Sequence, residues 1–170
     1  MNHLDREKAI EVFIYVSRHS TNIYNILKII YFADKEHLGN YGRFIYGDTY
    51  IAMENGPVPS FAYDIAKCIR GDGVYSIPEV KENDFLIKDQ YHISPKRDAK
   101  QNCLSDTDIE CLNNAIKTYG NMSFSRLRRI SHEQADFKDI HTSLDGVMPI
   151  EVIAKHLPDA EALIEHIKNQ

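Results

Sequence analysis

The sequence predicts a mainly α-helical fold, in which a compact helical domain surrounds a central apolar helix and carries one or two short β elements. Apolar residues recur at helical spacing through most of the chain. Residues 29–33 are apolar on every side, which is typical of a helix that other helices surround. Only residues 49–53 and 85–94 have the β-branched and aromatic character, or the hairpin pattern, that indicates strands.

Two helices are expected at the N-terminal end. Residues 4–19 place apolar side chains at helical spacing, and Asp5 and Glu7 lie near the positive end of the helix dipole. Residues 20–22 interrupt the pattern and supply capping side chains for a second helix over residues 22–38. The second helix is the central one, because it contains the segment that is apolar on all sides.

A short strand and a proline-rich corner follow. The strand is expected over residues 49–53. The motif Gly56-Pro57-Val58-Pro59 cannot lie inside a helix, because its two prolines fix φ and lack N–H donors. The next helix is expected from Pro59 or Ser60 to residue 70, since Gly71 is a typical residue just beyond a helix.

The remaining expected elements are shorter. Ser105 and Asp108 have the spacing of a capping box before a helix that ends near residue 119. The others are a hairpin over residues 85–94 with its turn at Asp89 and Gln90, a helix over 123–134, a loop over 142–147, and closing helices over 149–156 and 159–168. We divide the chain into a domain over residues 1–147 and a helical extension over 148–170, which is expected to pack on the domain.

Composition and charge narrow the class of protein. A net charge of −5 favours a basic partner and argues against a broad nucleic-acid interface. The three cysteines lack metal-ligand spacing and are expected to be reduced thiols, as in a cytoplasmic protein. No apolar run reaches transmembrane length and the N-terminus is polar, so no membrane segment or signal peptide is expected. Common catalytic motifs such as His-Glu-x-x-His and Gly-x-Ser-x-Gly do not occur, which argues against an enzyme.

Residues 27–60 contain an ordered series of short motifs. They are Tyr31-Phe32-Ala33-Asp34-x-x-His37-Leu38, Tyr41-Gly42-Arg43, Gly47-Asp48, Tyr50-x-Ala52-Met53 and Gly56-Pro57-Val58-Pro59-Ser60. In this order and spacing they resemble the signature of the Panacea domain, the family of the SocA-like antitoxins and many phage-associated proteins. The family's usual first Leu is replaced by Ile30, and the Trp usual near residue 136 is missing.

This resemblance implies a mostly helical, non-enzymatic antitoxin of a toxin–antitoxin system that needs no cofactor. Such a protein neutralises a cognate protein toxin, usually encoded beside it, by direct contact. The similarity is strong over residues 27–60 and weaker out to about residue 137.

Asp34 and His37 form one candidate site. Asp34 lies on the same side of the second helix as Leu27 and Ile30, so its carboxylate points toward the interior and needs partners there. One interpretation is a metal site or an acid–base pair in a small hydrolase, since the two residues lie one turn apart. The favoured interpretation is a structural polar anchor formed by Asp34, His37 and Arg43. In it Asp34 accepts hydrogen bonds from N–H groups of residues 41–48 or pairs with Arg43.

Other residues of the same segment are candidates for contact with the toxin. Phe32 lies on a polar-leaning face of the second helix, where a later helix covers it or a partner binds it. The proline-rich corner is a rigid recognition element, a structural end of the strand, or both. The predicted partner-binding residues are Phe32, Tyr50, Met53, Gly56, Pro57, Val58, Pro59 and Ser60.

Arg126, Arg128 and Arg129 form a basic cluster on one expected helix. Such a cluster occurs on helices that bind a DNA groove, which makes a transcriptional regulator the main alternative to an antitoxin. Acidic residues follow closely and the chain is acidic overall, so a solvated or internally paired helix face is the favoured interpretation.

Overall fold

The computed structural model of the chain describes residues 3–72, 76–141 and 146–169, and it confirms the mainly helical fold with few short strands. The helices are α1 (Arg6–Ser17), α2 (Ile23–Tyr41), α3 (Ser60–Arg70), α4 (Asp106–Tyr119), α5 (Phe124–His132), α6 (Ala135–His141), α7 (Ile150–Ala154) and α8 (Ala160–Lys168). The strands are β1 (Tyr50–Met53), β2 (Gly56–Pro59), β3 (Phe85–Ile87), β4 (Ile93–Pro95) and β5 (Val147–Met148), and a 3₁₀ turn, η1 (Gln101–Cys103), precedes α4.

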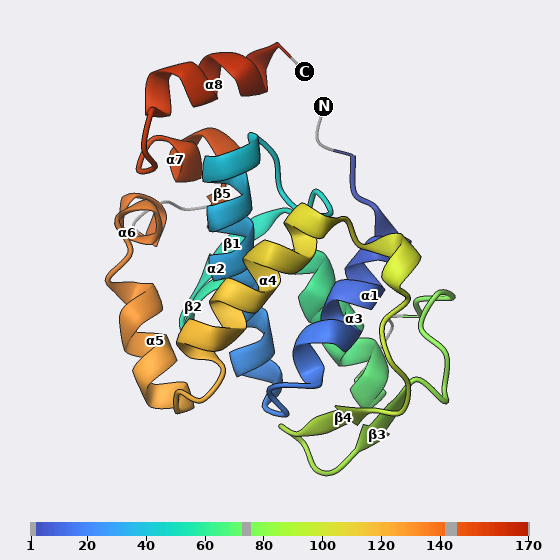
Figure 1. Ribbon diagram of the computed structural model, residues 1–170. Helices are drawn as coiled ribbons and strands as arrows, with labels where there is room; N and C mark the ends of the chain where they lie inside the picture. The colour runs from blue at the N-terminus through green and yellow to red at the C-terminus, as the bar shows by residue number, and fades with distance from the viewer. Residues whose placement is uncertain (1–2, 73–75, 142–145, 170) are drawn as a thin grey trace.

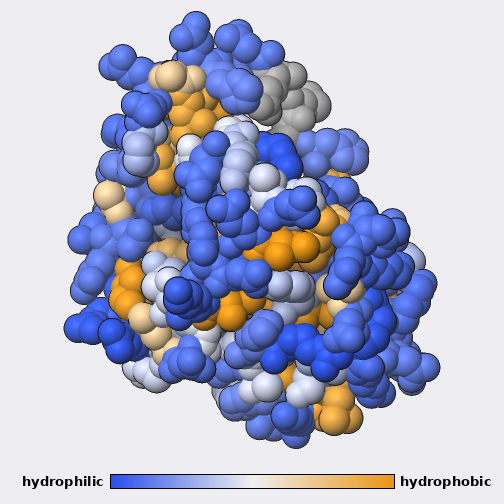
Figure 2. Space-filling model, in the orientation of Figure 1, coloured by the Kyte–Doolittle hydropathy of each residue, from blue (hydrophilic) through white to orange (hydrophobic). Residues whose placement is uncertain are grey.

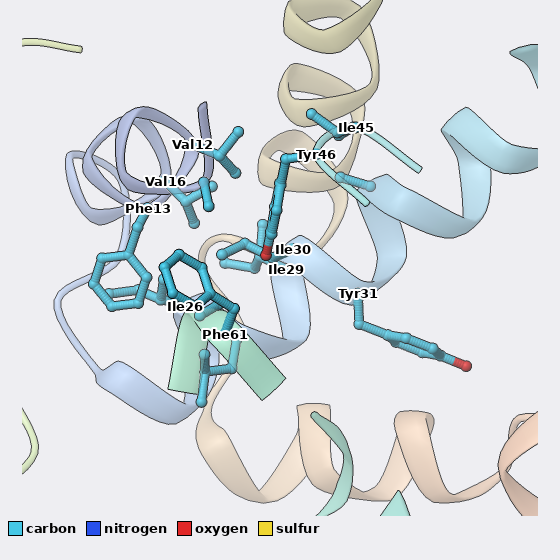
Figure 3. Packing of buried hydrophobic residues seen from close by; sticks show 14 of the residues in the cluster. Val12, Phe13, Val16, Ile26, Ile29, Ile30, Tyr31, Ile45, Tyr46 and Phe61 are labelled. Carbon is cyan, nitrogen blue, oxygen red and sulfur yellow. The ribbon is translucent and has the colours of Figure 1, made fainter. Parts of the chain in front are cut away.

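The centre of the fold is α2, as its all-round apolar segment predicts. In Figure 1 it runs through the middle of the molecule, with α4 crossing in front of it, α5 on one side and α1 and α3 on the other. Ile29, Ile30 and Ala33 are fully buried. Figure 3 shows side chains of α1, α2 and α3 meeting on one side of α2, whereas Tyr31 points away from them. A helix packed in this way has no face free for a partner over its middle turns.

The β1 and β2 strands form a tight antiparallel hairpin beside α2. Tyr50 pairs with Pro59 and Met53 with Gly56, and β5 pairs with the other edge of β1. The Gly-Pro-Val-Pro motif is therefore a strand, where only a corner was expected. Its two prolines are tolerated because β2 is an edge strand of the sheet. The β3 and β4 strands form the expected second hairpin, with Phe85 opposite Pro95.

Several helix boundaries follow the capping chemistry of the sequence. Asn22 accepts a hydrogen bond from the backbone N–H of Asn25 at 3.1 Å and caps α2. The capping box of Ser105 and Asp108 is complete in both directions. At its other end α2 continues three residues beyond the expected residue 38 and ends where Gly42 adopts a left-handed conformation, with φ of 74°.

The C-terminal part differs from the expectation. Neither α6 nor β5 was predicted, and the α5 helix ends at His132 rather than at residue 134. Val147, expected in a loop, pairs with Ile51; residues 142–145 of that loop lie outside the described residues. The expected boundary between residues 147 and 148 falls within β5. Figure 2 shows a mostly hydrophilic face with several separate hydrophobic patches, one of which lies over α7 and α8, where these two helices contact each other.

Candidate functional site

Asp34 is fully buried on α2 and joins it to the segment that leads into β1. One carboxylate oxygen accepts a hydrogen bond from the backbone N–H of Ile45 at 2.8 Å, and the other accepts one from the Tyr50 hydroxyl at 2.7 Å. Burial raises the pKa of the Asp34 carboxyl to about 7, because the lowering effect of these hydrogen bonds does not cancel desolvation. The expected contact with an N–H of residues 41–48 is confirmed, whereas Arg43 does not pair with Asp34.

His37 and Arg43 meet a different carboxylate, that of Asp108 on α4. The Nδ1 atom of His37 lies 2.9 Å from the carbonyl oxygen of Arg43, and its Nε2 atom lies 3.2 Å from an oxygen of Asp108. The guanidinium of Arg43 lies 3.7 Å from the same oxygen, and Lys8 binds the other at 2.8 Å. Although burial opposes it, hydrogen bonds from His37, Lys8 and Ser105 hold the pKa of Asp108 well below its usual range. These residues join α1, α2 and α4.

Asp34 and His37 therefore do not converge on a common point. The oxygens of Asp34 face Ile45 and Tyr50, and the ring nitrogens of His37 face Arg43 and α4. Within the described ranges, no three His, Cys, Asp or Glu side chains come together as a set of metal ligands. The arrangement supports the interpretation of these residues as buried connectors.

Asp48 is a second buried carboxylate, and sequence reasoning gave it no role. It accepts hydrogen bonds from the backbone N–H groups of Thr49 at 2.8 Å, Phe61 at 2.9 Å and Ala62 at 3.1 Å. Because Pro59 has no side chain that can cap α3, Asp48 supplies this cap from a segment that precedes β1. A helix that opens directly after a proline is the signal that could have suggested a distant cap.

Two predicted partner-binding residues lie in the core, where other side chains of the fold cover them. Phe32 is 8% exposed, and its ring stacks on that of Tyr119 of α4, with centroids 4.1 Å apart. Tyr50 is 1% exposed and points inward to Asp34. For Phe32 the interpretation that a later helix covers it is therefore confirmed, and Tyr50 offers no contact area to a partner because its side chain points inward.

The proline-rich motif is also mostly covered. Gly56, Pro57, Val58 and Pro59 are buried, and Ser60 is half-buried. Gly56 has a φ of 107°, and a Cβ atom there would lie 2.8 Å from the Lys28 ammonium and 2.6 Å from the Ser131 hydroxyl. Only glycine fits this backbone conformation and this close approach. Met53, in contrast, is 38% exposed at the edge of the hairpin.

Two hollows meet at Tyr24 and Asn55, and we call their lining residues the Asn55 surface. The first is a cavity of about 140 Å³ lined by Tyr24, Leu27, Lys28, Met53, Glu54, Asn55, Val58 and Tyr63. The second, of about 390 Å³, is lined by Asn22, Tyr24, Asn55, Tyr91, His92 and Phe124. Sequence reasoning missed most of this surface, because its side chains come from separate segments that only the fold brings together.

Aromatic side chains line both hollows of the Asn55 surface. The ring centroid of Tyr24 lies 6.1 Å from that of Tyr91 and 5.6 Å from that of Phe124. Tyr91 is 46% exposed. Exposed tyrosine and methionine are enriched at protein–protein interfaces, because they offer large amphipathic contact areas. The surface has the composition of a protein-binding site.

The basic cluster lies on α5, at the border of this surface. Arg126, Arg128 and Arg129 are all exposed. The Nε atom of Arg128 donates a hydrogen bond to the side-chain oxygen of Asn55 at 2.9 Å, so one member of the cluster is bound to the β1–β2 turn.

Comparison with known protein families gives one result. The sequence model of the family described as Antitoxin SocA-like, Panacea domain, matches residues 26–136, which is more than half of the chain. No curated protein and no solved structure gave a match. Among the described residues, no helix combines the length and apolar character that a membrane crossing requires.

Proposed function

Because the chain belongs to the SocA-like Panacea antitoxin family, we propose that it is an antitoxin that neutralises a cognate protein toxin by binding it. The toxin is expected to be the product of a neighbouring gene, and the complex is expected to form in the cytoplasm. Neutralisation by direct binding requires a surface that fits the toxin, and it requires no catalytic step and no cofactor.

The observation that carries the proposal is the Asn55 surface. It combines hollows with exposed aromatic and methionine side chains, which are the usual anchors and pockets of a protein interface. Of the residues predicted for partner binding, Met53 and Val58 line the first hollow. We propose that these two residues act there with Tyr24, Tyr63 and Tyr91. The buried Phe32 and Tyr50 then support the surface from within.

The surface also has a rigid support. The β1–β2 turn at residues 54–55 is tied to α2 through Lys28 and to α5 through Arg128. A surface that is ordered before binding loses less conformational entropy when the complex forms. This favours a stable inhibitory complex.

Co-expression tests the proposal directly. The neighbouring gene should arrest growth when expressed alone, and expression of this chain should restore growth. Met53→Asp should weaken rescue, because it places a charge in the interface. Leu86→Asp is the matched control, since Leu86 is also an exposed apolar residue, at 51%, but lies on β3 outside the Asn55 surface. Growth arrest that this chain does not relieve, or purified proteins that form no complex, would contradict the proposal.

A further inference from the structure

Lys28 is a buried cation without an acidic partner in the described part of the chain. It is 2% exposed on α2, and its ammonium donates a hydrogen bond to the backbone carbonyl of Asn55. None of the ion pairs among the described residues includes Lys28, whereas the neighbouring Lys35 pairs with Asp136 at 3.0 Å. Burying an ammonium costs several kcal/mol unless a carboxylate or several hydrogen bonds compensate. One carbonyl leaves most of this cost in place.

A second cation increases the positive potential at the same place. Arg128 binds the side chain of Asn55 while Lys28 binds its backbone carbonyl, so two positive groups hold one residue of the turn. Burial, with a contribution from Arg128, lowers the pKa of the Lys28 ammonium to about 8. The local charge is therefore opposite in sign to the net charge of −5 of the whole chain.

Apart from Lys28 itself, the walls of the cavity beside it are largely apolar and aromatic. Leu27, Val58 and Met53 provide apolar contacts, Tyr24 and Tyr63 provide aromatic ones, and Glu54 and Asn55 complete the lining from the β1–β2 turn. Its volume of about 140 Å³ is several times the share of roughly 30 Å³ that one water molecule takes in the liquid. Lys28 is buried and has the second cation Arg128 beside it, whereas Glu54 is exposed to solvent, so the cations dominate the inner part of the cavity. A partly apolar cavity with a cation in its wall suits a short aliphatic stem that ends in a carboxylate.

We infer that this cavity receives an Asp or Glu side chain of the protein partner, whose carboxylate forms a buried ion pair with Lys28. The inference rests on the proposed function, since the partner is the toxin. The aliphatic part of the incoming side chain packs against Leu27 and Val58. The new pair supplies the charge compensation that no described residue gives to Lys28, and this makes the contact a centre of affinity and specificity.

Binding should then change the protonation of Lys28. In the free protein at pH 8.5 the ammonium, with a pKa of about 8, is mostly deprotonated. A carboxylate at contact distance favours the charged form, so the complex takes up about half a proton or more when it forms. At pH 6.5 Lys28 is already protonated in both states and contributes no uptake. Other charged or titratable groups near the cavity are Tyr24, Glu54, Tyr63, Arg128 and His132.

The experiment is calorimetric titration of the full chain with an inactive variant of the toxin, in two buffers of different ionisation enthalpy. The parent should take up protons at pH 8.5, and Lys28→Met should abolish the uptake and weaken binding by about 30-fold or more. Lys117→Met is the matched control: it removes the same charge from an exposed site on α4 and should change neither quantity.

The outcomes separate the inference from the proposed function. Equal affinity of the parent and Lys28→Met, or no proton uptake by a parent protein that still binds the toxin, would overturn the carboxylate contact and leave the antitoxin role intact. A parent that binds no toxin would overturn both. If Lys28→Met does not fold, neutral replacements of the toxin's Asp and Glu residues provide the test, because one of them must abolish the uptake by the parent chain.

Discussion

Replacing Asp34 with alanine should destabilise the protein strongly, and the effect should depend on pH. The substitution leaves two buried polar groups without their partner, the backbone N–H of Ile45 and the hydroxyl of Tyr50, which shares a hydrogen bond with the Asp34 carboxyl whether or not that carboxyl is protonated. Each orphaned group costs about 1–3 kcal/mol. Because the two sites are adjacent and their effects are not additive, we expect a loss of about 2–4 kcal/mol in the free energy of unfolding at pH 5.

The sign of the pH dependence follows from the direction of the pKa change. The pKa of the Asp34 carboxyl is about 7 in the folded protein, whereas its ordinary value, which applies to the unfolded chain, is 3.8. Between these values the folded state binds more protons than the unfolded state, so this contribution to stability is present at low pH and is lost as the pH rises. The loss between pH 5 and pH 7 is about 2 kcal/mol at roughly 1.4 kcal/mol per pH unit. Asp34→Ala should therefore cost less at pH 7 than at pH 5, by about this amount.

Urea unfolding of the parent and the variant at pH 5, 6 and 7 measures these differences. Asp34→Asn is the matched control, because its amide oxygen can accept from Ile45, its NH₂ group can donate to the Tyr50 oxygen, and it does not titrate. It should be less destabilised than Asp34→Ala at pH 5 and should show the same trend with pH. Equal stability of Asp34→Ala and the parent at pH 5, or a difference that stays constant up to pH 7, would refute the reasoning.

Three further predictions concern other residues. Asp48→Ala should lower the free energy of unfolding by about 1–2 kcal/mol, a typical cost of losing a helix cap; hydrogen exchange should show faster exchange of the amides of Phe61 and Ala62, and unchanged exchange would contradict the capping role. Phe32→Ala should cost about 3–5 kcal/mol in thermal or urea unfolding because the residue is a core aromatic, and Phe32→Leu should keep toxin affinity; a well-folded Phe32→Leu that no longer binds the toxin would argue for direct contact. In gel-shift assays at low salt we expect no DNA binding, and a salt-sensitive shift that Arg128→Ala weakens would favour the regulator instead.

The local chemistry of the sequence was sufficient for much of the fold. Caps such as Ser105 with Asp108, and helix ends such as Gly71, depend on neighbouring residues, so a pattern over a few positions predicts them. The inward direction of Asp34 also followed from its place on an apolar stripe. The α6 and β5 elements could not be found in this way. The β5 strand has two residues and exists only through pairing with Tyr50 and Ile51, almost a hundred positions earlier.

The burial of Phe32 and Tyr50 could not be derived from the sequence for a related reason. Periodicity identifies the apolar side of a helix that has one polar side, but α2 is covered on nearly every side. Its polar-leaning face contains Asn25, Lys28, Phe32 and Lys35, and of these four, Asn25, Lys28 and Phe32 are buried and Lys35 is half-buried. A polar side chain on such a helix indicates a specific partner within the fold rather than exposure to solvent.

The polar residues of α2 differ in whether their contact within the fold compensates their charge. Each makes a contact with a different surrounding segment: Asn25 with Met122, Lys28 with Asn55, Asp34 with Ile45, Lys35 with Asp136 and His37 with Asp108. Among the residues that the structure describes, the ammonium of Lys35 has a carboxylate partner, whereas that of Lys28 has a backbone carbonyl and no carboxylate. Lys28 also lines a cavity of the Asn55 surface. Stability alone would be served as well by an apolar residue at position 28, since a buried ammonium without a carboxylate is costly. A cation kept at this cost, in the wall of a cavity, is best explained by a charge that arrives with the partner.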